Sequence, residues 1–252
     1  MASGREWWKD FFDPAFYTPG DEFHLRGAPK EARLIRRALG LRRGLRVLDL
    51  CCGTGRHSLE LAAGGCRVVG VDASEPYLRR AAREARRRRL DASFLLGDMR
   101  RLAFRAEFDA AFNFFTSFGY FPKASDDLRV LRGVLRALRP GAPFLIDLLD
   151  GEWTRENFQA RDWSPLPGGG VRLEERRLEG KGRLLRNRWT NLRRGFPPRT
   201  EEFVLRLYDR PTLSALLRSA GFRSIRAVPP GKIAEYGLSP ARLVLLARKV
   251  LK

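Results

Sequence analysis

Val47-Leu48-Asp49-Leu50-Cys51-Cys52-Gly53-Thr54-Gly55-Arg56-His57-Ser58 is the stretch of this chain that decides its fold. An apolar run typical of a strand ends at an acidic residue and a glycine-rich turn, and the pattern that follows is helical. Glycines let the backbone approach a ligand closely, and the amides that open the helix direct their positive ends toward it. The stretch therefore predicts a nucleotide-binding turn between a strand and a helix.

The spacing of the glycines separates the classes of nucleotide that such a turn binds. A dinucleotide fingerprint needs a third glycine where this chain has Ser58, and the phosphate-binding pattern G-x-x-x-x-G-K-[ST] is absent. The next apolar run, residues 68–71, ends at Asp72, where the ribose hydroxyls of a nucleoside would need a bidentate acceptor. A glycine-rich turn without a ligand is the structural alternative.

The whole stretch resembles motif I of the class I S-adenosylmethionine (SAM)-dependent methyltransferases, an apolar run followed by D-L-x-C-G-T-G. Residues 138–147 are close to the L-x-P-G-G turn of that family, with Ala142 in place of the second glycine. The resemblance implies an α/β fold with a doubly wound, mostly parallel seven-stranded sheet of the Rossmann-like type. It also implies SAM as the cofactor.

The composition limits the class of protein. A chain of 252 residues is long enough for one α/β domain with an insertion. Residues 1–9 contain no apolar segment, and no apolar run is long enough to span a bilayer, so we expect a cytoplasmic protein without a membrane partner. The three cysteines and two histidines have neither disulfide nor metal-ligand spacing, so we expect no metal.

The formal charge of +20 has two explanations. A basic surface is typical of nucleic-acid binding. However, 42 of the 49 basic residues are Arg and the chain has only four Asn and one Gln, a composition that also suits a GC-rich or heat-adapted (thermophile) source. The longest basic run, residues 79–89, has no interleaved aromatic residues that would stack on bases. A solvated helix is the favoured interpretation of this run.

The order of the predicted elements divides the chain into three parts. Residues 1–45 are an aromatic-rich helical cap segment, in which Trp8, Phe11 and Phe12 line one face of a short helix ending at Asp13-Pro14, and a second helix covers residues 31–39. Residues 46–150 and 209–252 alternate strands and helices and form the SAM-binding core. Residues 151–208 hold three strand-like runs, 171–178, 184–192 and 201–208, and form an antiparallel insertion that acts as a lid.

Polar residues lie at or beside the ends of four successive predicted strands: Asp49, Asp72, Asp98 and Asn113. The carboxyl ends of parallel strands meet at one edge of a sheet, which is where such sheets bind ligands. We therefore expect these four side chains to converge on one crevice. Ser74 follows the second strand and is predicted to cap the next helix.

The resemblance assigns roles to individual residues. It places Asp49 near the methionine amino group, Gly53 and Gly55 beside the methionine part, Asp72 at the ribose, and Asp98 at the adenine amino group. The full set implied to bind the cofactor is Asp49, Cys51, Gly53, Gly55, Asp72, Ala73, Asp98, Met99 and Asn113. The resemblance implies that the acceptor lies beside the segment after the fourth strand. Our candidate substrate contacts are Phe114, Phe118, Arg206 and Tyr208, and Arg206 is included because its charge could pair with an acidic group on the substrate. The candidate catalytic residues are Tyr17, His57 and Tyr120.

Two classes of acceptor are disfavoured. The [DNS]-P-P-[FYW] motif of enzymes that methylate exocyclic or amide nitrogens would begin at Asn113, where the chain reads N-F-F-T. Methylation of pyrimidine carbon 5 needs a cysteine nucleophile after the fourth strand, and no cysteine follows Cys66. We therefore expect methyl transfer to an oxygen, nitrogen or carbon atom of a small molecule, in a monomer or homodimer. An RNA methyltransferase that uses the arginine surface and a SAM-binding module without turnover are the alternatives.

Overall fold

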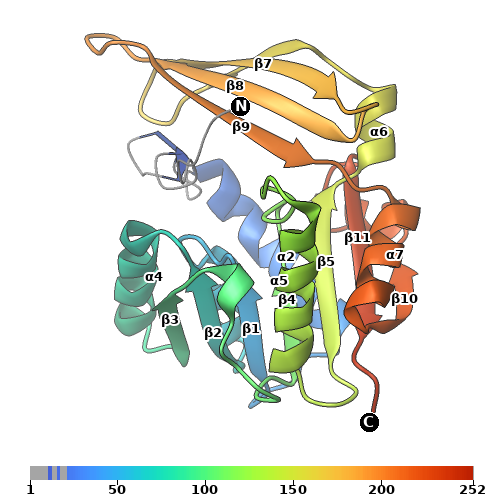
Figure 1. Ribbon diagram of the computed structural model, residues 1–252. Coiled ribbons are helices and arrows are strands. Elements are labelled where there is room, and N and C mark those ends of the chain that lie inside the picture. Colours follow the sequence, from blue (N-terminus) through green and yellow to red (C-terminus); the bar gives the residue numbers. More distant parts are fainter. Residues whose placement is uncertain (1–10, 13–15, 18–21, 252) are drawn as a thin grey trace.

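The computed structural model describes residues 11–12, 16–17 and 22–251. Within this part, a seven-stranded sheet with helices on both faces carries a second, four-stranded sheet across the carboxyl ends of its parallel strands (Figure 1). The predicted doubly wound α/β fold is therefore confirmed. Trp8 and the predicted helix end at Asp13-Pro14 lie outside the described residues.

The large sheet has the strand order β10-β11-β5-β4-β1-β2-β3 among the described residues. Strands β1 to β5 are parallel where they pair, whereas β11 runs antiparallel to both β5 and β10. The strand bounds are β1 Arg46–Leu50, β2 Arg67–Asp72, β3 Ala92–Leu96, β4 Ala110–Asn113, β5 Pro143–Leu149, β10 Arg223–Ala227 and β11 Arg242–Arg248. The strand order changes direction between β1 and β4, the kind of position at which open α/β sheets bind ligands.

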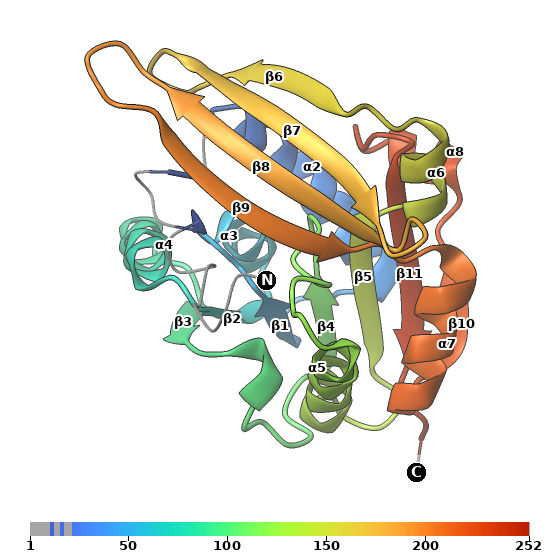
Figure 2. The ribbon, with the colours of Figure 1, turned by 45° about the horizontal axis from the view of Figure 1, so that its top comes forward.

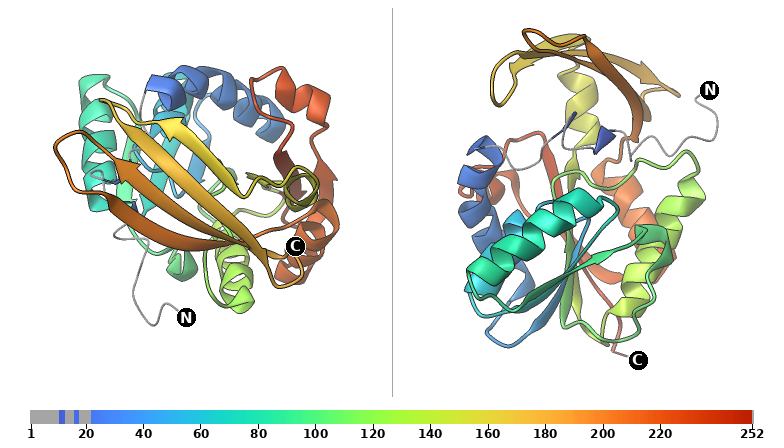
Figure 3. Two further views of the ribbon diagram at one scale, coloured as in Figure 1. Left: turned by 90° about the horizontal axis from the view of Figure 1, so that it is seen from above. Right: turned by 90° about the vertical axis from the view of Figure 1, so that its left-hand side faces the viewer.

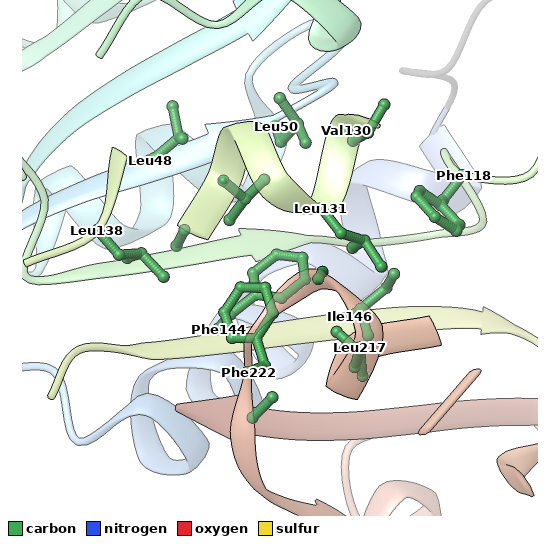
Figure 4. Packing of buried hydrophobic residues seen from close by; sticks show 14 of the residues in the cluster. Leu48, Leu50, Phe118, Val130, Leu131, Leu138, Phe144, Ile146, Leu217 and Phe222 are labelled. Carbon is green, nitrogen blue, oxygen red and sulfur yellow. The ribbon is translucent and has the colours of Figure 1, made fainter. Parts of the chain in front are cut away.

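Helices cover both faces of this sheet. The helical segments are α2 Glu22–Leu39, α3 Arg56–Ala63, α4 Glu75–Arg87, η1 Met99–Arg101, α5 Ala124–Ala137, α6 Gly151–Glu156, α7 Arg210–Ala220 and α8 Pro230–Ala234. One apolar cluster joins α5 and α7 to the sheet, with Leu131 and Leu217 packed around Phe144 and Phe222 (Figure 4). A second cluster joins α2, α3 and α8 to the opposite face. The core therefore lies between the sheet and its helices, which leaves the carboxyl ends of the strands available for a site.

The small sheet has the order β6-β7-β8-β9, and all its neighbouring strands are antiparallel. Its bounds are β6 Arg161–Pro165, β7 Val171–Glu179, β8 Leu184–Leu192 and β9 Arg199–Arg206. All four strands fall within residues 151–208. The views in Figures 2 and 3 show that this sheet spans the end of the large sheet at which β1 and β4 finish. We keep the division into cap, core and insertion as a proposal.

The structure adds detail to the prediction for Ser74 and differs from the sequence at two other places. Helix α2 begins at Glu22, nine residues before the predicted start at Glu31, because Pro29 lies inside the helix rather than at its boundary. Ser74 is at the N-cap of α4, but its hydroxyl makes no capping bond and donates to the carbonyl oxygen of Phe12 at 3.2 Å. Strand β6 was not predicted, because the run around Trp163 lacks the alternation of apolar and polar residues that marks a strand.

Candidate active site

The turn after β1 adopts the backbone conformation that its glycines allow. Gly53 and Gly55 have φ values of 55° and 78°, in the left-handed region that favours glycine, and Cys51 also lies there with φ 61°. A Cβ atom at Gly55 would lie only 2.9 Å from the Cβ of Ala81, so a side chain at this position would force α4 away. Glycine at 55 thus allows close packing of α3 and α4, whereas Gly53 lines a cavity.

This cavity has a volume of about 390 Å³ and lies at the carboxyl ends of the central strands. Ten of the sequence-predicted residues line it: Tyr17, Cys51, Gly53, His57, Asp72, Ala73, Asp98, Met99, Phe114 and Tyr120. The structure therefore brings together residues from the N-terminal segment, the turn after β1, and the ends of β2, β3 and β4. Asp49, Gly55, Asn113, Phe118, Arg206 and Tyr208 are not among the lining residues.

Two carboxylates, Asp72 and Asp98, form one part of the cavity wall. Asp72 accepts hydrogen bonds from the backbone amides of Gly53 at 2.8 Å and Ser74 at 2.9 Å, which fix its orientation, and burial raises its pKa. Asp98 accepts from the guanidinium of Arg100 at 2.6 to 3.0 Å. Partial burial raises the pKa of Asp98, but its hydrogen bonds from Arg100 more than offset this and leave the pKa below its ordinary value. The carboxylate of Asp98 is therefore ionised at neutral pH.

Aromatic side chains form another part of the wall. We name Phe11, Phe12, Tyr17, Tyr120 and Trp189 the aromatic cap, all of which line the cavity. Phe11 lies at its centre, with ring centroids 5.4 Å from Tyr17 and 5.3 Å from Trp189, while Phe12 meets Tyr120 edge to face at 6.2 Å. Such contacts exclude water and hold the rings in fixed positions. Trp189 comes from β8, so the small sheet contributes directly to the cavity.

Hydrogen bonds fasten the N-terminal part of this cap at both sides. The side-chain amide nitrogen (Nδ2) of Asn191 on β8 donates to the carbonyl oxygen of Phe16 at 2.7 Å. From the core side, the hydroxyl of Tyr77 on α4 donates to the carbonyl oxygen of Tyr17. The N-terminal segment is therefore held between the small sheet and the helix that follows β2.

Comparison with known proteins identifies the domain to which this cavity belongs. Residues 47–141 match the family model described as "Methyltransferase domain". The chain contains a methyltransferase domain. This domain includes the turn after β1, both carboxylates of the cavity and the segment after β4, and the prediction of a methyltransferase is confirmed at this level.

Relatives and solved structures extend this likeness. The chain is 39% identical over 119 residues to the cypemycin N-terminal methyltransferase of a Streptomyces species, an alignment that covers 47% of this chain and 48% of that protein. The chain thus spans about half the length of the curated relatives it matches. The CcbJ methyltransferase of Streptomyces caelestis superposes with a TM-score of 0.73 at 20% identity, covering 96% of each chain.

A further structural neighbour is the SAM-bound amino pentose methyltransferase CalS10 of Micromonospora echinaspora. It has a TM-score of 0.67 at 23% identity and covers 90% of this chain and 94% of that protein. At these identities the two structures establish the fold alone. The chain therefore shares its fold with these two methyltransferase structures over 96% and 90% of its length.

Asp49 and Asn113 lie beneath the cavity of the methyltransferase domain rather than in its wall. Asp49 is buried and accepts a hydrogen bond of 2.6 Å from the hydroxyl of Ser58, and burial raises its pKa to about 7. Asn113 donates to the carbonyl oxygen of Leu50 at 2.9 Å, which ties β4 to β1. Both side chains therefore hold the segments on either side of the turn after β1, and neither lines the cavity.

His57 belongs to a buried cluster that the sequence did not reveal. Its Nε2 atom is 2.6 Å from a carboxylate oxygen of Glu31 on α2, and the same oxygen accepts a hydrogen bond from Arg56. Burial and the charge of Arg56 lower the pKa of His57 to about 4, so the ring is neutral at neutral pH. Burial raises the pKa of Glu31, but its bonds and charge interactions with His57 and Arg56 outweigh this and lower it overall. Glu31 therefore orients His57 and neutralises Arg56.

Phe118, Arg206 and Tyr208 form part of the junction between the methyltransferase core and the insertion. The hydroxyl of Tyr208 donates to Asp127 at 2.7 Å, and the guanidinium of Arg206 donates to the same carboxylate oxygen at 3.2 Å. Phe118 is fully buried with its ring centroid 5.7 Å from that of Tyr208. Burial raises the pKa of Asp127 to about 6 despite these two donors. The structure thus places these residues beside the end of β9, away from the cavity.

The described residues contain neither a metal-binding cluster nor a membrane-spanning helix. Across residues 11–12, 16–17 and 22–251, no three His, Cys, Asp or Glu side chains are grouped so that they would hold a metal ion. No helix in the same part of the chain has the length and apolar character needed to cross a membrane.

Proposed function

We propose that this protein transfers the methyl group of SAM to an oxygen or nitrogen atom of a small molecule held under the aromatic cap. The observation that carries this proposal is the composition of the cavity. One part of its wall has two fixed carboxylates beside a glycine-rich turn, another part is aromatic, and residues 47–141 match the methyltransferase domain. A donor with polar hydroxyl and amino groups and a less polar acceptor fit these two parts.

The residues around the two carboxylates fit SAM. Asp72 has both oxygens oriented by backbone amides and lines the cavity, as an acceptor for two ribose hydroxyls must. Asp98, ionised and beside Met99, suits the amino group and the ring of adenine. Gly53 lines the wall without a side chain that would exclude the methionine part. When bound, SAM supplies an electrophilic methyl group on its sulfonium.

The chain's own contribution to the reaction is positioning and exclusion of water. The aromatic cap forms part of the cavity wall, and its mutual ring contacts hold Tyr17 and Trp189 in place. In-line displacement at a methyl group needs donor and acceptor close together and aligned, so rigid walls supply much of the rate acceleration. This role does not require a dedicated base.

The candidate acid–base residues differ in what they offer an acceptor. Neutral His57, held by Glu31, is a hydrogen-bond partner and a proton acceptor of low basicity, because its pKa is about 4. Burial raises the pKa of Tyr120 above its ordinary value of 10, so its phenol stays protonated and acts as a donor or acceptor of hydrogen bonds. We propose that Tyr17, His57 and Tyr120 orient the acceptor and that Phe114 packs against it.

The names of two similar proteins support a small acceptor. One relative methylates the N-terminus of cypemycin by its name, and one structural neighbour is an amino pentose methyltransferase. Both names describe methylation outside nucleic acids. Since the chain spans about half the length of its curated relatives, the identity of the acceptor is taken from the cavity and not from them. A cytoplasmic location, a heat-adapted source and a monomeric or homodimeric state stay predictions from composition.

The formal charge of +20 is the observation that favours RNA as a second candidate acceptor. The basic run lies on α4, which buries Tyr77, Leu78, Ala81 and Ala85 and exposes most of its arginines. The arginines at 86–89 lie at the C-terminal end of α4 and just beyond it, whereas Tyr77, near the N-terminal end of the same helix, lines the cavity. Several of its arginines also pair locally, Arg79 with Glu75 at 3.1 Å and Arg87 with Glu84 at 2.7 Å. This separation favours the small molecule.

The test is a survey of methyl incorporation from labelled SAM into the metabolite and RNA fractions of a cell extract. We expect label in the metabolite fraction, and turnover within a few-fold of wild type when the four arginines at 86–89 are replaced by Ser. Label in RNA, with activity that falls steeply with salt at a log-log slope near −0.7 per phosphate contacted, would instead support the RNA alternative. Saturable SAM binding without label in either fraction would indicate a binding module.

A further inference from the structure

Two consecutive residues in the wall of the cavity have a backbone conformation that their side chains disfavour. Phe115 and Thr116 have φ values of 66° and 57°, and both residues line the cavity directly after β4. This left-handed conformation is uncommon outside glycine and is a marked outlier for a β-branched or bulky residue. Strained backbone persists only where the surroundings determine it strongly, and it is concentrated at functional sites. We refer to these two residues as the Phe115–Thr116 turn.

Asp147, in the middle of β5, holds the backbone of this turn. Its carboxylate accepts a hydrogen bond from the amide of Phe115 at 2.8 Å. Its own carbonyl oxygen accepts from the amide of Thr116 at 3.0 Å. The side chain of Asp147 is fully buried, so water does not compete for these bonds. A single residue outside the cavity therefore fixes two successive amides of its wall.

Arg242, at the start of β11, holds the side chains of the same turn. Its Nε atom donates to the carboxylate of Asp147 at 2.9 Å, and its NH1 group donates to the hydroxyl of Thr116 at 2.8 Å. The guanidinium carbon lies 5.1 Å from the ring centroid of Phe115, within the range of a cation–π contact. Only 11% of this side chain is exposed, so the ion pair with Asp147 is shielded from solvent. Arg242 thus contacts the two side chains of the turn, whereas Asp147 binds its two backbone amides.

A second guanidinium, from a distant part of the sequence, contacts the same ring. The guanidinium carbon of Arg56, at the start of α3, lies 4.7 Å from the ring centroid of Phe115. Arg56 lines the cavity and is itself held by Glu31. The position of Phe115 therefore depends on charged groups from the helix after the nucleotide-binding turn and from the last strand. Through Phe115, the helix that follows the glycine-rich turn is thus connected to β11.

We propose that Asp147 and Arg242, neither of which lines the cavity, are positioning residues for methyl transfer that act through the Phe115–Thr116 turn. The turn forms the wall against which the acceptor is aligned with the donor, so its displacement reduces turnover more than it reduces SAM binding. A misplacement of about 1 Å is enough to cost on the order of a hundredfold in rate. This inference rests on the proposed function, because it assigns a role within that reaction.

Three variants and one control test the inference. Thr116→Ser keeps the hydroxyl that Arg242 contacts, Thr116→Gly removes it while relieving the left-handed strain, and Arg242→Lys keeps the charge but loses the planar guanidinium. Arg248→Lys is the matched control, since Arg248 is exposed on the same strand and its guanidinium donates to the carbonyl oxygen of Gly141 at 3.1 Å. Each is assayed with labelled SAM and the metabolite fraction that the wild type methylates, alongside SAM affinity by calorimetry and the midpoint of thermal unfolding (Tm).

For Arg242→Lys and Thr116→Gly we expect kcat/KM for the acceptor to fall by about thirtyfold or more, with SAM affinity within about threefold of wild type. Thr116→Ser and Arg248→Lys should remain within about threefold in both measurements. Thr116→Gly decides the matter, because a purely structural turn predicts that its activity follows its Tm. We expect its Tm to stay within about 2 °C of wild type or to rise while its turnover falls.

Two results would overturn the inference: turnover by Thr116→Gly and Arg242→Lys within threefold of wild type, or a loss of SAM affinity as large as the loss of turnover. Either would leave the proposed function intact, since the wild type would still transfer label. A wild type that binds SAM and transfers no label to any fraction would contradict the proposed function itself, and the inference with it.

Discussion

The buried ion pair between Glu31 and Arg56 offers a sharp test of how the cavity wall is held. Glu31→Gln keeps the size of the side chain but removes its charge. The side chains of Arg56 and Glu31 are only 6% and 9% exposed, so the guanidinium would stay buried without its carboxylate. Breaking a buried pair from one side costs about 3 to 5 kcal/mol because the remaining charge is uncompensated. Since Gln still offers one oxygen to Arg56, we expect a loss of about 3 kcal/mol in the free energy of unfolding.

Urea unfolding at pH 7.5, followed by circular dichroism, measures this loss. The control is Glu84→Gln, which breaks an i,i+3 pair with Arg87 whose side chains are 35% and 71% exposed. We expect the control to unfold at the wild-type midpoint, because exposed pairs contribute little. A Glu31→Gln protein as stable as the control would refute the view that Glu31 neutralises Arg56 in a solvent-excluded cluster.

Three further predictions follow from the geometry. Asp72→Ala should lose about 1.5 to 3 kcal/mol of SAM binding, roughly ten- to a hundredfold in affinity, and unchanged affinity by calorimetry would exclude Asp72 from the ribose site. The pKa of His57 is lowered from 6.5 to about 4, so the stability contributed by the neutral ring is complete above pH 6.5 and is lost as the pH falls through 4. Between pH 7 and pH 4, the free energy of unfolding of His57→Gln should therefore fall by about 3 kcal/mol less than that of the wild type. Equal decreases for the two proteins in denaturant titrations would contradict the lowered pKa of His57. Finally, EDTA should leave methyl transfer unchanged, whereas activity lost to EDTA and restored by a divalent ion would reveal a metal requirement.

The fold was predictable because its signals are local. The turn after β1, with Gly53 and Gly55, has a pattern that few other structures share, and apolar runs ending in Asp72 and Asp98 mark the strand ends that converge. Ten of the proposed site residues line the cavity for this reason. Sequence periodicity failed at α2, where Pro29 lies inside the helix, and at β6, whose pairing with β7 is what makes it a strand.

The supporting residues of the site were not predictable, because their roles depend on contacts between distant parts of the chain. Glu31 meets His57 from a separate helix, 26 residues earlier in the chain. Arg242 meets Thr116 across 126 residues, and nothing near either residue marks the pairing. Trp189 faces the cavity only because β8 is placed over the carboxyl ends of the large sheet. Conversely, Arg206 was expected at the substrate for its charge, but that charge pairs with buried Asp127.

A crystal structure of the protein with S-adenosylhomocysteine, the product that SAM leaves after methyl transfer, tests the central claim most directly. The claim is that one cavity holds the donor at its two carboxylates and the acceptor under the aromatic cap. We predict the ribose hydroxyls within hydrogen-bonding distance of the Asp72 carboxylate, the adenine beside Asp98 and Met99, and the sulfur atom facing Tyr17 and Trp189. A ligand bound outside this cavity, or bound with its sulfur directed away from the aromatic cap, would contradict the account.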